Sequence, residues 1–536
     1  MPAFIFVSGG VISGLGKGIT TASISFLLKS YGLKVAPIKC DPYVNVDAGT
    51  MNPIEHGEVF VTDDGIETDQ DIGHYERFLN ESLSRVNYTT TGQIYQSVIK
   101  KERALGYNGR CVEVVPHVPE EMIRRFKEAG RKTKADVVII EIGGTVGEYQ
   151  NVLFIEANRI MKVRDKENVI HIHLGYLPVP PSLEEMKTKP IQISTRMLNE
   201  TGIQPDFIVA RGIRMLDKER KEKIALFCNV DVESVISNPD VESIYETPLI
   251  LDQQGLGEKI IKKLGQKRKK KDLQEWRELI KKIQSVKKRV VIGIVGKYQK
   301  TGDYILSDAY VSVIEAIKHA SWYLGRKPEI VWLDAERLQP EMLKKIDGLI
   351  VPQGWGGRGV EGKIKAVQFV REKGIPYLGL CFGMQMAVIE FSRHVCGLKN
   401  AHSVEVNPKT PHPVINIMPN QEAYLKKHQY GGTIRLGAWP CRIRKGTIVF
   451  GAYKKTKISE RHRHRYELNN QYREKLEKAG LVIAGTSPDG KLVEVIELSK
   501  KLHPFFVGTQ FHPEYKSRPL FPHPIFLAFI KACVSG

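Results

Sequence analysis

The sequence predicts an α/β protein with two doubly wound domains. An apolar strand from Phe4 to Ser8 runs into a glycine-rich loop, and the residues after the loop place their apolar side chains on one helical face. A second apolar strand begins at Val290 and restarts the same kind of pattern. Because 536 residues exceed what one core usually holds, we expect an N-terminal domain over residues 1–265, a linker over 266–289 and a C-terminal domain over 290–536.

Composition and charge indicate a globular chain that needs no membrane. The 42% of hydrophobic residues form no long apolar run, and the N-terminal strand lacks the basic leader and long apolar core of a signal peptide. The seven cysteines contain no CxxC pair, so neither a disulfide framework nor a structural zinc site is predicted, and a cytoplasmic, reducing location is expected. The net charge of +20 suits polyanionic ligands such as triphosphates and also permits nucleic-acid binding.

Much of the positive charge is concentrated between the two predicted domains. The stretch from Lys262 to Arg289 contains the runs Lys267 to Lys271 and Lys287 to Arg289, with helical character between them. We interpret this stretch as a solvated interdomain linker, with a nucleic-acid-binding arm as the alternative.

The first glycine-rich loop has the features of a phosphate-binding cradle. Gly14, Gly16, Lys17 and Gly18 lie between a buried strand and a helix, where backbone N–H groups and the helix end can surround an anion. The match to the Walker A pattern is imperfect, because Val11 stands where glycine is usual and Gly18 replaces the hydroxyl residue after the lysine.

Two carboxylates could supply the metal ligand that this loop lacks. Asp71 lies in a dense acidic patch, and Glu141 ends a predicted buried strand. An acid at the carboxyl end of a buried parallel strand is typical of a metal–triphosphate site, although each could be a solvated loop residue instead. Lys39, at the end of the second predicted strand, is a further candidate for contact with phosphate.

The C-terminal domain contains a candidate nucleophile on a strand-to-helix turn. Cys381 follows an apolar run and lies between Gly379 and Gly383, which lack the Cβ atoms that would crowd a sharp turn. The positive end of the following helix favours a thiolate. If the later strand stays extended, His512 and Glu514 point to one face, so that one can accept the thiol proton and the other can hold the imidazole. A buried structural cysteine is the alternative.

This constellation resembles the Cys-His-Glu triad of the class I glutamine amidotransferases, which hydrolyse glutamine to release ammonia. The segment Ile350 to Gly359 is similar to the Pro-Gly-Gly-Phe-Gly loop of that family, whose N–H groups stabilise an oxyanion. Gln353 stands where relatives have the first glycine, so we expect strain and a slower glutaminase if that position needs a positive φ. The resemblance implies that glutamine is bound by Gly354, Phe382, Gly383, Met384, Gln385, Glu405 and Arg465.

The basic run Arg461 to Arg465 leaves two further interpretations. Arg463 is a second candidate, after Arg465, for the partner of the glutamine carboxylate. His462 and His464 alternate along the chain and could ligate a metal, but no acid or thiol accompanies them in the pattern, so we do not predict a metal site there.

The first 255 residues resemble the amidoligase domain of the CTP synthase family. Five blocks carry the resemblance: Ser8 to Gly18, Lys39 to Asp47, Gly57 to Thr62, Gly73 to Phe78 and Lys187 to Gln192. The resemblance implies a P-loop, Rossmann-like amidoligase domain fused to the glutamine amidotransferase domain. It also implies a C–N ligase that makes CTP from UTP: ATP phosphorylates the uracil O4, and ammonia then displaces phosphate at C4.

The same resemblance implies the residues of the nucleotide sites. ATP is expected at Gly14, Leu15, Gly16, Lys17, Gly18, Ile19, Lys39, Asp71, Pro239, Asp240 and Val241. UTP or CTP is expected at Ser13, Glu148, Tyr149, Gln150, Lys187, Thr188, Lys189, Pro190, Ile191, Gln192 and Lys223. Asp71 and Glu141 are expected to hold Mg²⁺ with ATP.

Two departures from the family pattern concern regulation. Relatives have a carboxylate where this chain has Gln150, so feedback inhibition by the product CTP is in doubt. The segment Gln299 to Ser307 is longer than usual near the lid that responds to GTP in relatives, so activation by GTP is less secure. Relatives are homotetramers, and we expect the same here.

Two rival functions remain open at this point. One is another P-loop amidoligase joined to a glutaminase, such as a cobyrinic acid amidase, which is not expected to have the blocks around Lys39 and Lys187. The other is a non-catalytic P-loop scaffold that binds nucleic acid through its basic linker. The scaffold predicts salt-sensitive DNA binding and no requirement for Cys381.

Overall fold

The computed structural model describes residues 2–165, 168–267, 269–296, 300–301, 304–305, 307–418, 421, 424 and 431–535. The chain forms two compact units, and they do not follow the order of the sequence. The first unit contains residues 1–47 and 71–280, and the second contains residues 48–70 and 281–536. The predicted α/β class is confirmed, whereas the predicted domain limits stay a prediction. In the described ranges, no helix combines the length and apolar character that a membrane crossing requires.

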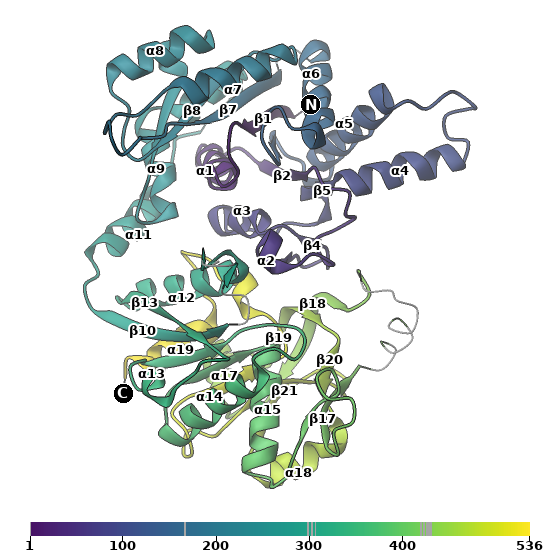
Figure 1. The fold of residues 1–536 in the computed structure, drawn as a ribbon, viewed down its shortest axis with the longest axis vertical. Helices are drawn as coiled ribbons and strands as arrows, with labels where there is room; N and C mark the ends of the chain where they lie inside the picture. The colour runs from purple at the N-terminus through teal and green to yellow at the C-terminus, as the bar shows by residue number, and fades with distance from the viewer. Residues whose placement is uncertain are drawn as a thin grey trace. The chain divides into compact units, whose positions relative to one another are not determined.

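The first unit is built on a seven-stranded, wholly parallel sheet (Figure 1). Its strands, in spatial order, are β5 (Tyr88–Thr90), β2 (Val35–Asp41), β6 (Val137–Ile142), β1 (Ala3–Gly9), β7 (Val169–Tyr176), β8 (Phe207–Gly212) and β9 (Val235–Pro239). Its longer helices are α1 (Lys17–Ser30), α3 (Asp71–Leu79), α4 (Thr91–Arg103), α5 (Val114–Thr133), α6 (Val152–Arg164), α7 (Lys189–Glu200), α8 (Lys218–Cys228), α9 (Thr247–Gln253) and α10 (Leu256–Lys263).

Strand β1 shows why this sheet is covered on both faces. All seven of its residues are buried, as in parallel sheets that have helices on each side. Phe4 and Phe6 pack into a core with α4, α5 and α6, whereas Ile5 and Val7 pack into a second core with α1, α9 and α10. The carboxyl ends of the central strands therefore meet at one edge, where the phosphate loop follows β1.

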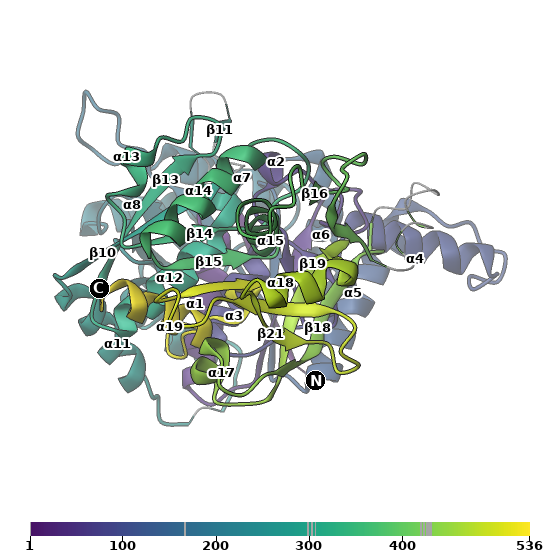
Figure 2. The same ribbon diagram turned by 90° about the horizontal axis from the view of Figure 1, so that it is seen from below.

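The second unit has a nine-stranded mixed sheet. Its strands, in spatial order, are β13 (Lys327–Asp334), β10 (Arg289–Gly296), β14 (Gly348–Val351), β15 (Tyr377–Leu380), β23 (Phe506–Thr509), β22 (Val493–Glu497), β21 (Val482–Thr486), β18 (Arg435–Ile443) and β19 (Lys457–His464). Pairing is parallel from β13 to β23 and antiparallel from β23 to β19. Helices α14 (Val360–Lys373) and α15 (Phe382–His394) cover one face, and α12 (Val311–Tyr323), α17 (Ile448–Tyr453) and α19 (Pro524–Cys533) cover the other (Figure 2).

Smaller elements complete the second unit. They include α2 (Pro53–His56), β3 (Phe60–Val61) and β4 (Glu67–Thr68) in the 48–70 segment, the short strands β11 (Lys300–Thr301) and β12 (Tyr304–Ile305), the sheet of β16 (His402–Ser403), β17 (Pro413–Ile417) and β20 (Tyr466–Leu468), and the helices α13 (Pro340–Leu343) and α18 (Arg473–Lys478). The end of the strand expected from Val290 to Tyr298 lies outside the described residues.

The stretch interpreted as a solvated linker is partly buried. It contains α11 (Gln274–Ser285), where Trp276, Leu279 and Ile280 are buried. The Trp276 ring lies 4.2 Å from the Phe26 ring, and its Nε1 donates to the Tyr245 carbonyl oxygen at 2.8 Å. The interpretation as a solvated linker rests on the lysine runs on either side of α11. It is wrong for α11 itself, because the apolar side chains between the runs form one buried helical face.

We predict that Trp276→Ala lowers the free energy of unfolding of the protein by about 3–5 kcal/mol. The substitution leaves a cavity beside Phe26 and removes the donor to a buried carbonyl. Urea denaturation followed by circular dichroism measures the effect, with Leu226→Ala, at a position that is 78% exposed, as the control. A loss equal to that of the control would contradict the prediction.

Candidate active sites

Cys381 lies at a sharp turn between β15 and α15. Its backbone has φ 52° and ψ −98°, a conformation that few side chains adopt. A Cβ at Gly383 would lie 2.0 Å from the Val351 carbonyl oxygen, and a Cβ at Gly379 would lie 2.7 Å from the carbonyl carbon of Gly383. The backbone N–H of Cys381 donates to Thr509 at 2.7 Å, which ties the turn to β23. The flanking glycines are therefore required by close backbone packing.

His512 and Glu514 lie next to each other, but not for the reason that the sequence suggested. Strand β23 ends at Thr509, and residues Pro513–Lys516 form a 3₁₀ turn, so the expectation of a continuing extended strand is wrong. The turn still brings the two side chains together, and His512 Nδ1 donates to Glu514 Oε1 at 2.8 Å. Both side chains are buried, so the carboxylate holds one orientation of the ring.

The imidazole of His512 is electrostatically matched to a thiolate. Burial lowers the pKa of His512, but the Glu514 carboxylate and the Cys381 sulfur outweigh burial and raise the pKa to about 10. No other described group hydrogen-bonds to the buried Nε2 atom of His512. The Cys381 sulfur contacts the Arg463 carbonyl oxygen at 3.9 Å and accepts from Gln510 Nε2 at 3.5 Å. At neutral pH the His512 ring therefore carries a positive charge beside the Cys381 sulfur, and a neighbouring cation is the usual setting of a reactive cysteine.

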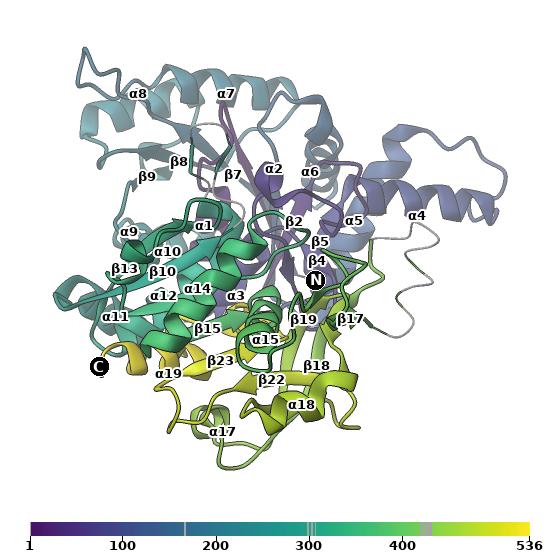
Figure 3. The same cartoon turned by 60° about the horizontal axis from the view of Figure 1, so that its bottom comes forward.

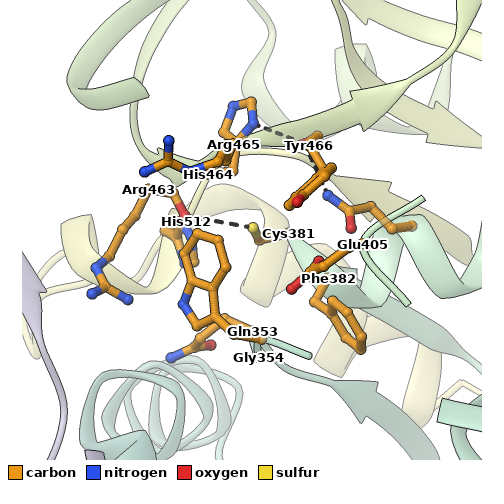
Figure 4. Close-up of a pocket in the computed structure, with 12 residues that line it drawn as sticks. Gln353, Gly354, Cys381, Phe382, Glu405, Arg463, His464, Arg465, Tyr466 and His512 are labelled. Atoms are coloured by element: carbon orange, nitrogen blue, oxygen red, sulfur yellow. Dashed lines mark hydrogen bonds between the residues drawn. The ribbon is translucent and has the colours of Figure 1, made fainter. Parts of the chain in front are cut away.

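A small pocket surrounds Cys381 in the second unit (Figure 4). It is lined by Gln353, Gly354, Trp355, Cys381, Phe382, Gln385, Glu405, Arg463, His464, Arg465, Tyr466 and His512. Most of the residues expected to bind glutamine are among these, but Gly383 and Met384 are not, and Met384 packs in the core. The sequence reasoning missed Trp355 and Tyr466 as lining residues, although each adjoins a predicted one.

Polar contacts shape the walls of this pocket. The Gly356 N–H donates to Glu405 Oε1 at 2.7 Å, and Arg465 Nη2 donates to the Thr433 hydroxyl at 3.1 Å. Arg463 instead directs its guanidinium away from the thiol (Figure 4), and its Nε donates to Glu67 Oε1 at 2.8 Å. Arg465 is therefore better placed than Arg463 to meet a ligand carboxylate. Among the described residues, the histidines next to these arginines are not part of a metal cluster.

Gln353 is not strained, contrary to expectation. Positive φ values in its loop occur at Gly356 and Gly359, and Gln353 does not have one. Its side-chain Nε2 instead lies 3.5 Å from Glu58 Oε1. The side chain that replaces glycine thus contacts the 48–70 segment.

The 48–70 segment also supplies carboxylates to β19. Arg461 Nε donates to Asp63 Oδ1 at 2.7 Å, and Glu67 pairs with Arg463. Burial raises the pKa of Asp63, but Arg461 and Lys516 lower it to about 2. A cavity of about 270 Å³ lies between this segment and the glutaminase loops, lined by Gly49, Thr50, Met51, Pro53, Trp355, Glu405, Ile434, Arg463, Arg465 and Tyr466.

The glycine-rich loop of the first unit leads directly into α1. Gly16 caps the helix with φ 87°, and Lys17 Nζ donates to the Gly144 carbonyl oxygen at 2.7 Å. A Cβ at Gly18 would lie 1.9 Å from Asp71 Oδ1. The carboxylate of Asp71 therefore occupies the space where other phosphate loops have a hydroxyl side chain, which explains the glycine.

Lys39 contacts both of the acids that are predicted to bind a metal, Asp71 and Glu141. Its ammonium donates to the Asp71 carboxylate and, at 3.1 Å, to Glu141 Oε1, while the Tyr75 hydroxyl donates to Glu141 Oε2. Burial and Asp71 raise the pKa of Glu141 to about 7, although Lys39 opposes the shift. Two buried carboxylates that already face one cation form a donor set of the kind that Mg²⁺ prefers, so the residues fit this ion.

The other predicted nucleotide residues follow the carboxyl ends of the parallel strands. Ser13 follows β1, Glu148 follows β6, Lys187 follows β7, and Pro239 ends β9. Their exposure to solvent differs widely. Ile191 is buried in the core, Tyr149 is 97% exposed, and Lys223 lies on the exposed part of α8.

Comparison with known proteins gives a consistent result over the whole chain. The family model "CTP synthase N-terminus" matches residues 3–266, and "Glutamine amidotransferase class-I" matches residues 305–532. A CTP synthase of Caldanaerobacter subterraneus is 53% identical, covering 100% of this chain and 99% of the relative. A CTP synthase of Bacillus subtilis is 48% identical with the same coverage. The solved glutaminase domain of Trypanosoma brucei CTPS with bound acivicin is 38% identical over 46% of this chain and 94% of that chain, with a TM-score of 0.42.

We predict that Glu514→Gln slows alkylation of Cys381 by iodoacetamide about tenfold at neutral pH. Without the carboxylate, burial dominates and the pKa of His512 falls, so the ring beside the Cys381 sulfur loses its positive charge at a lower pH. The measurement is the alkylation rate as a function of pH.

The matched control is Glu460→Gln, because Glu460 also pairs with a buried histidine, His523, at 3.1 Å. The control should leave the alkylation profile of Cys381 unchanged. An unchanged profile in Glu514→Gln would show that Glu514 does not set the charge of His512.

Proposed function

The chain belongs to the CTP synthase family, and from this premise we propose how its residues divide the amination of UTP to CTP. The enzyme is a C–N ligase that consumes ATP and takes its nitrogen from L-glutamine. The observation that carries the proposal is the buried arrangement of Cys381, His512 and Glu514 in one pocket. The cobyrinic acid amidase and the nucleic-acid scaffold are not favoured, because the full-length relatives reported above are CTP synthases.

Glutamine hydrolysis uses the triad of the second unit. The Cys381 thiolate attacks the carboxamide carbon of glutamine, and the electron pair of the C=O bond moves to oxygen, where N–H groups of the loop at Gly354 can stabilise it. The His512 imidazolium gives its proton to the departing nitrogen, so ammonia leaves and a thioester remains. Water activated by His512 then cleaves the thioester to glutamate and free thiolate. Glu514 keeps the ring in one orientation throughout.

Substrate recognition in this pocket follows from its charges. Arg465 is the proposed partner of the glutamine α-carboxylate, and Glu405 is the proposed partner of its α-amino group. Opposite charges at the two ends of an amino acid fix which carbon faces the nucleophile. Phe382 and Gln385 complete the wall around the side chain of glutamine.

Phosphoryl transfer and amination use the first unit. The N–H groups from Gly14 to Ile19 and Lys17 would bind the phosphates of ATP at the start of α1. Asp71 and Glu141 would hold Mg²⁺, which offsets negative charge on the transferred group. Lys39, already in contact with both acids, lies where it can meet the same phosphate. For UTP, the proposed residues are Ser13, Lys187, Lys189, Gln192 and Lys223, whose polar side chains are exposed or half-buried.

Regulation and assembly are also proposals, and they rest on the family. GTP is the proposed activator, CTP is the product and the proposed inhibitor, and a cytoplasmic homotetramer is the proposed form. Gln150 is exposed and offers an amide where relatives have an acid, which favours weaker feedback by CTP. Much of the segment Gln299 to Ser307 lies outside the described residues.

The central test replaces the nucleophile in the full chain. Cys381→Ala should lower glutamine-dependent CTP formation by more than about a thousandfold, because no thioester can form. CTP formation from ammonium chloride should remain near the wild-type rate, because the nucleotide sites are untouched. The measurement is CTP production from ATP, Mg²⁺ and UTP with either nitrogen source. No CTP from folded wild-type protein with both sources would exclude the function.

A second prediction concerns the departure at the phosphate loop. Gly18→Ser restores the usual residue of the motif, yet we expect it to lower CTP formation from both nitrogen sources by about a hundredfold or more. The new side chain would enter space that Asp71 occupies and displace a proposed metal ligand. Glutamine hydrolysis measured alone serves as the internal control and should persist. Full synthesis by Gly18→Ser would contradict the role assigned to Asp71.

A further inference from the structure

We propose that Tyr515 is a positioning residue of the glutaminase, which fixes the plane of the His512 ring by stacking on it and by donating a hydrogen bond to the Val59 carbonyl oxygen. The proposal rests on the catalytic role proposed above for His512. All of the residues involved belong to the second compact unit.

The stack places a rigid ring directly against the catalytic imidazole. The ring centroids of Tyr515 and His512 are 5.0 Å apart, with 17° between the ring planes. Tyr515 is 1% exposed, its N–H donates to the His512 carbonyl oxygen at 3.4 Å, and its own carbonyl oxygen accepts from Arg518 at 2.9 Å. An aromatic face stabilises a cation above it, so the stack favours the imidazolium form as well as one ring orientation.

The hydroxyl group gives this ring an anchor that stacking alone does not provide. Tyr515 donates to the Val59 carbonyl oxygen at 3.0 Å, and its ring meets the ring of Phe60 edge-on at 5.0 Å. The hydroxyl bond lies at the end of the ring that is farthest from its backbone. The hydroxyl bond at one end of the Tyr515 ring and the backbone contacts at the other therefore oppose rotation of the ring. They also oppose sliding of His512 across it.

The anchor itself is fixed from two sides. Glu58, the residue before Val59, is 2% exposed, and its Oε2 accepts from the Ser312 N–H at 3.0 Å and from the Ser312 hydroxyl. The Glu58 N–H donates to the Asp308 carbonyl oxygen at 2.9 Å. A carbonyl group held in this way provides a fixed reference point for the tyrosine hydroxyl.

The neighbouring residue Glu58 also contacts the other side of the catalytic centre. Its Oε1 lies 3.5 Å from Gln353 Nε2, on the loop that contains Gly354. Two adjacent residues, Glu58 and Val59, therefore contact both the oxyanion loop and the ring that supports the general base. Gln353, Cys381 and His512 all line the same pocket (Figure 4). Their relative position decides whether base and oxyanion donors act on the same carbonyl group.

A purely structural role for Tyr515 predicts different behaviour. A tyrosine that only fills the core contributes to stability and leaves the chemistry of His512 unchanged. The charged and titratable groups that face His512 are Glu514 on its own turn, Cys381 at the start of α15, and His462 and His464 on β19. None of these groups changes in a Tyr515 variant, so a change in the behaviour of His512 reports on its position.

The test is Tyr515→Phe in the full chain, which keeps the ring and removes only the hydroxyl group. We expect kcat for glutamine hydrolysis to fall about fivefold, the size of effect that one net hydrogen bond supports, with KM for glutamine unchanged. The pH dependence of Cys381 alkylation by iodoacetamide should shift toward that of Glu514→Gln. CTP formation from ammonium chloride should equal that of wild type.

The matched control is Tyr453→Phe. Tyr453 is half-buried in the same unit, and its hydroxyl donates to Glu460 Oε1 at 2.8 Å, away from the residues that line the pocket. The control should lower the melting temperature as much as Tyr515→Phe does and leave kcat and the alkylation profile unchanged. Wild-type kcat and alkylation in Tyr515→Phe, or an equal loss of kcat in both variants, would overturn the proposal.

The failure of the two proposals can be told apart. If glutamine hydrolysis persists in Cys381→Ala, the proposed catalytic triad is wrong, and so is the positioning role of Tyr515. If Cys381→Ala abolishes hydrolysis but Tyr515→Phe keeps the wild-type kcat and alkylation profile, only the proposed role of Tyr515 is wrong.

Discussion

The close approach of α15 to the strands beneath it is the constraint on which the glutaminase site depends. Gly383 packs against the Val351 carbonyl oxygen so tightly that any Cβ would overlap with it. This packing holds Cys381 in a backbone conformation that costs about 1–3 kcal/mol. Buried contacts of α15 offset that cost, because eleven of its thirteen residues are buried. The packing of α15 therefore presents the thiol at the start of the helix. Figure 3 shows α15 beside β15 and β23, the strands that position Cys381 and His512.

Both proposed centres also hold charges away from water and compensate them locally. Lys39 faces Asp71 and Glu141 in the first unit, and His512 faces Glu514 and Cys381 in the second. Buried ions in such groups are costly when one partner is lost. The two centres differ in how the compensation is used. In the first centre, Lys39 holds together two acids that are proposed to bind a metal ion. In the second, Glu514 stabilises the proton on His512, which His512 then donates to the departing nitrogen.

The sequence predicted the parts of the sites that depend on local structure. Glycines on either side of Cys381, and the strand, loop and helix around Lys17, are local patterns that impose their own geometry, and the structure contains both. The relation of His512 to Glu514 was expected for the wrong reason, because a 3₁₀ turn at Pro513 replaces the extended strand. Strain is expected at Gln353 because relatives have glycine there, but its φ is not positive and its side chain contacts Glu58, which lies 295 residues earlier in the chain. No local signal indicates such a contact, since tertiary packing alone decides it.

The position of the 48–70 segment shows that the glutaminase is not one continuous stretch of sequence. The segment leaves the first unit at Asp47, packs in the second unit, and rejoins the first at Asp71. Asp63 and Glu67 supply carboxylates to two arginines on β19, the buried Arg461 and the largely buried Arg463. A C-terminal fragment that starts at residue 281 would lose both carboxylates and the Val59 carbonyl group, and buried cations without their partners are strongly destabilising. The sequence between Asp47 and Asp71 is therefore part of the glutaminase by packing, even though its motif resembles the amidoligase half.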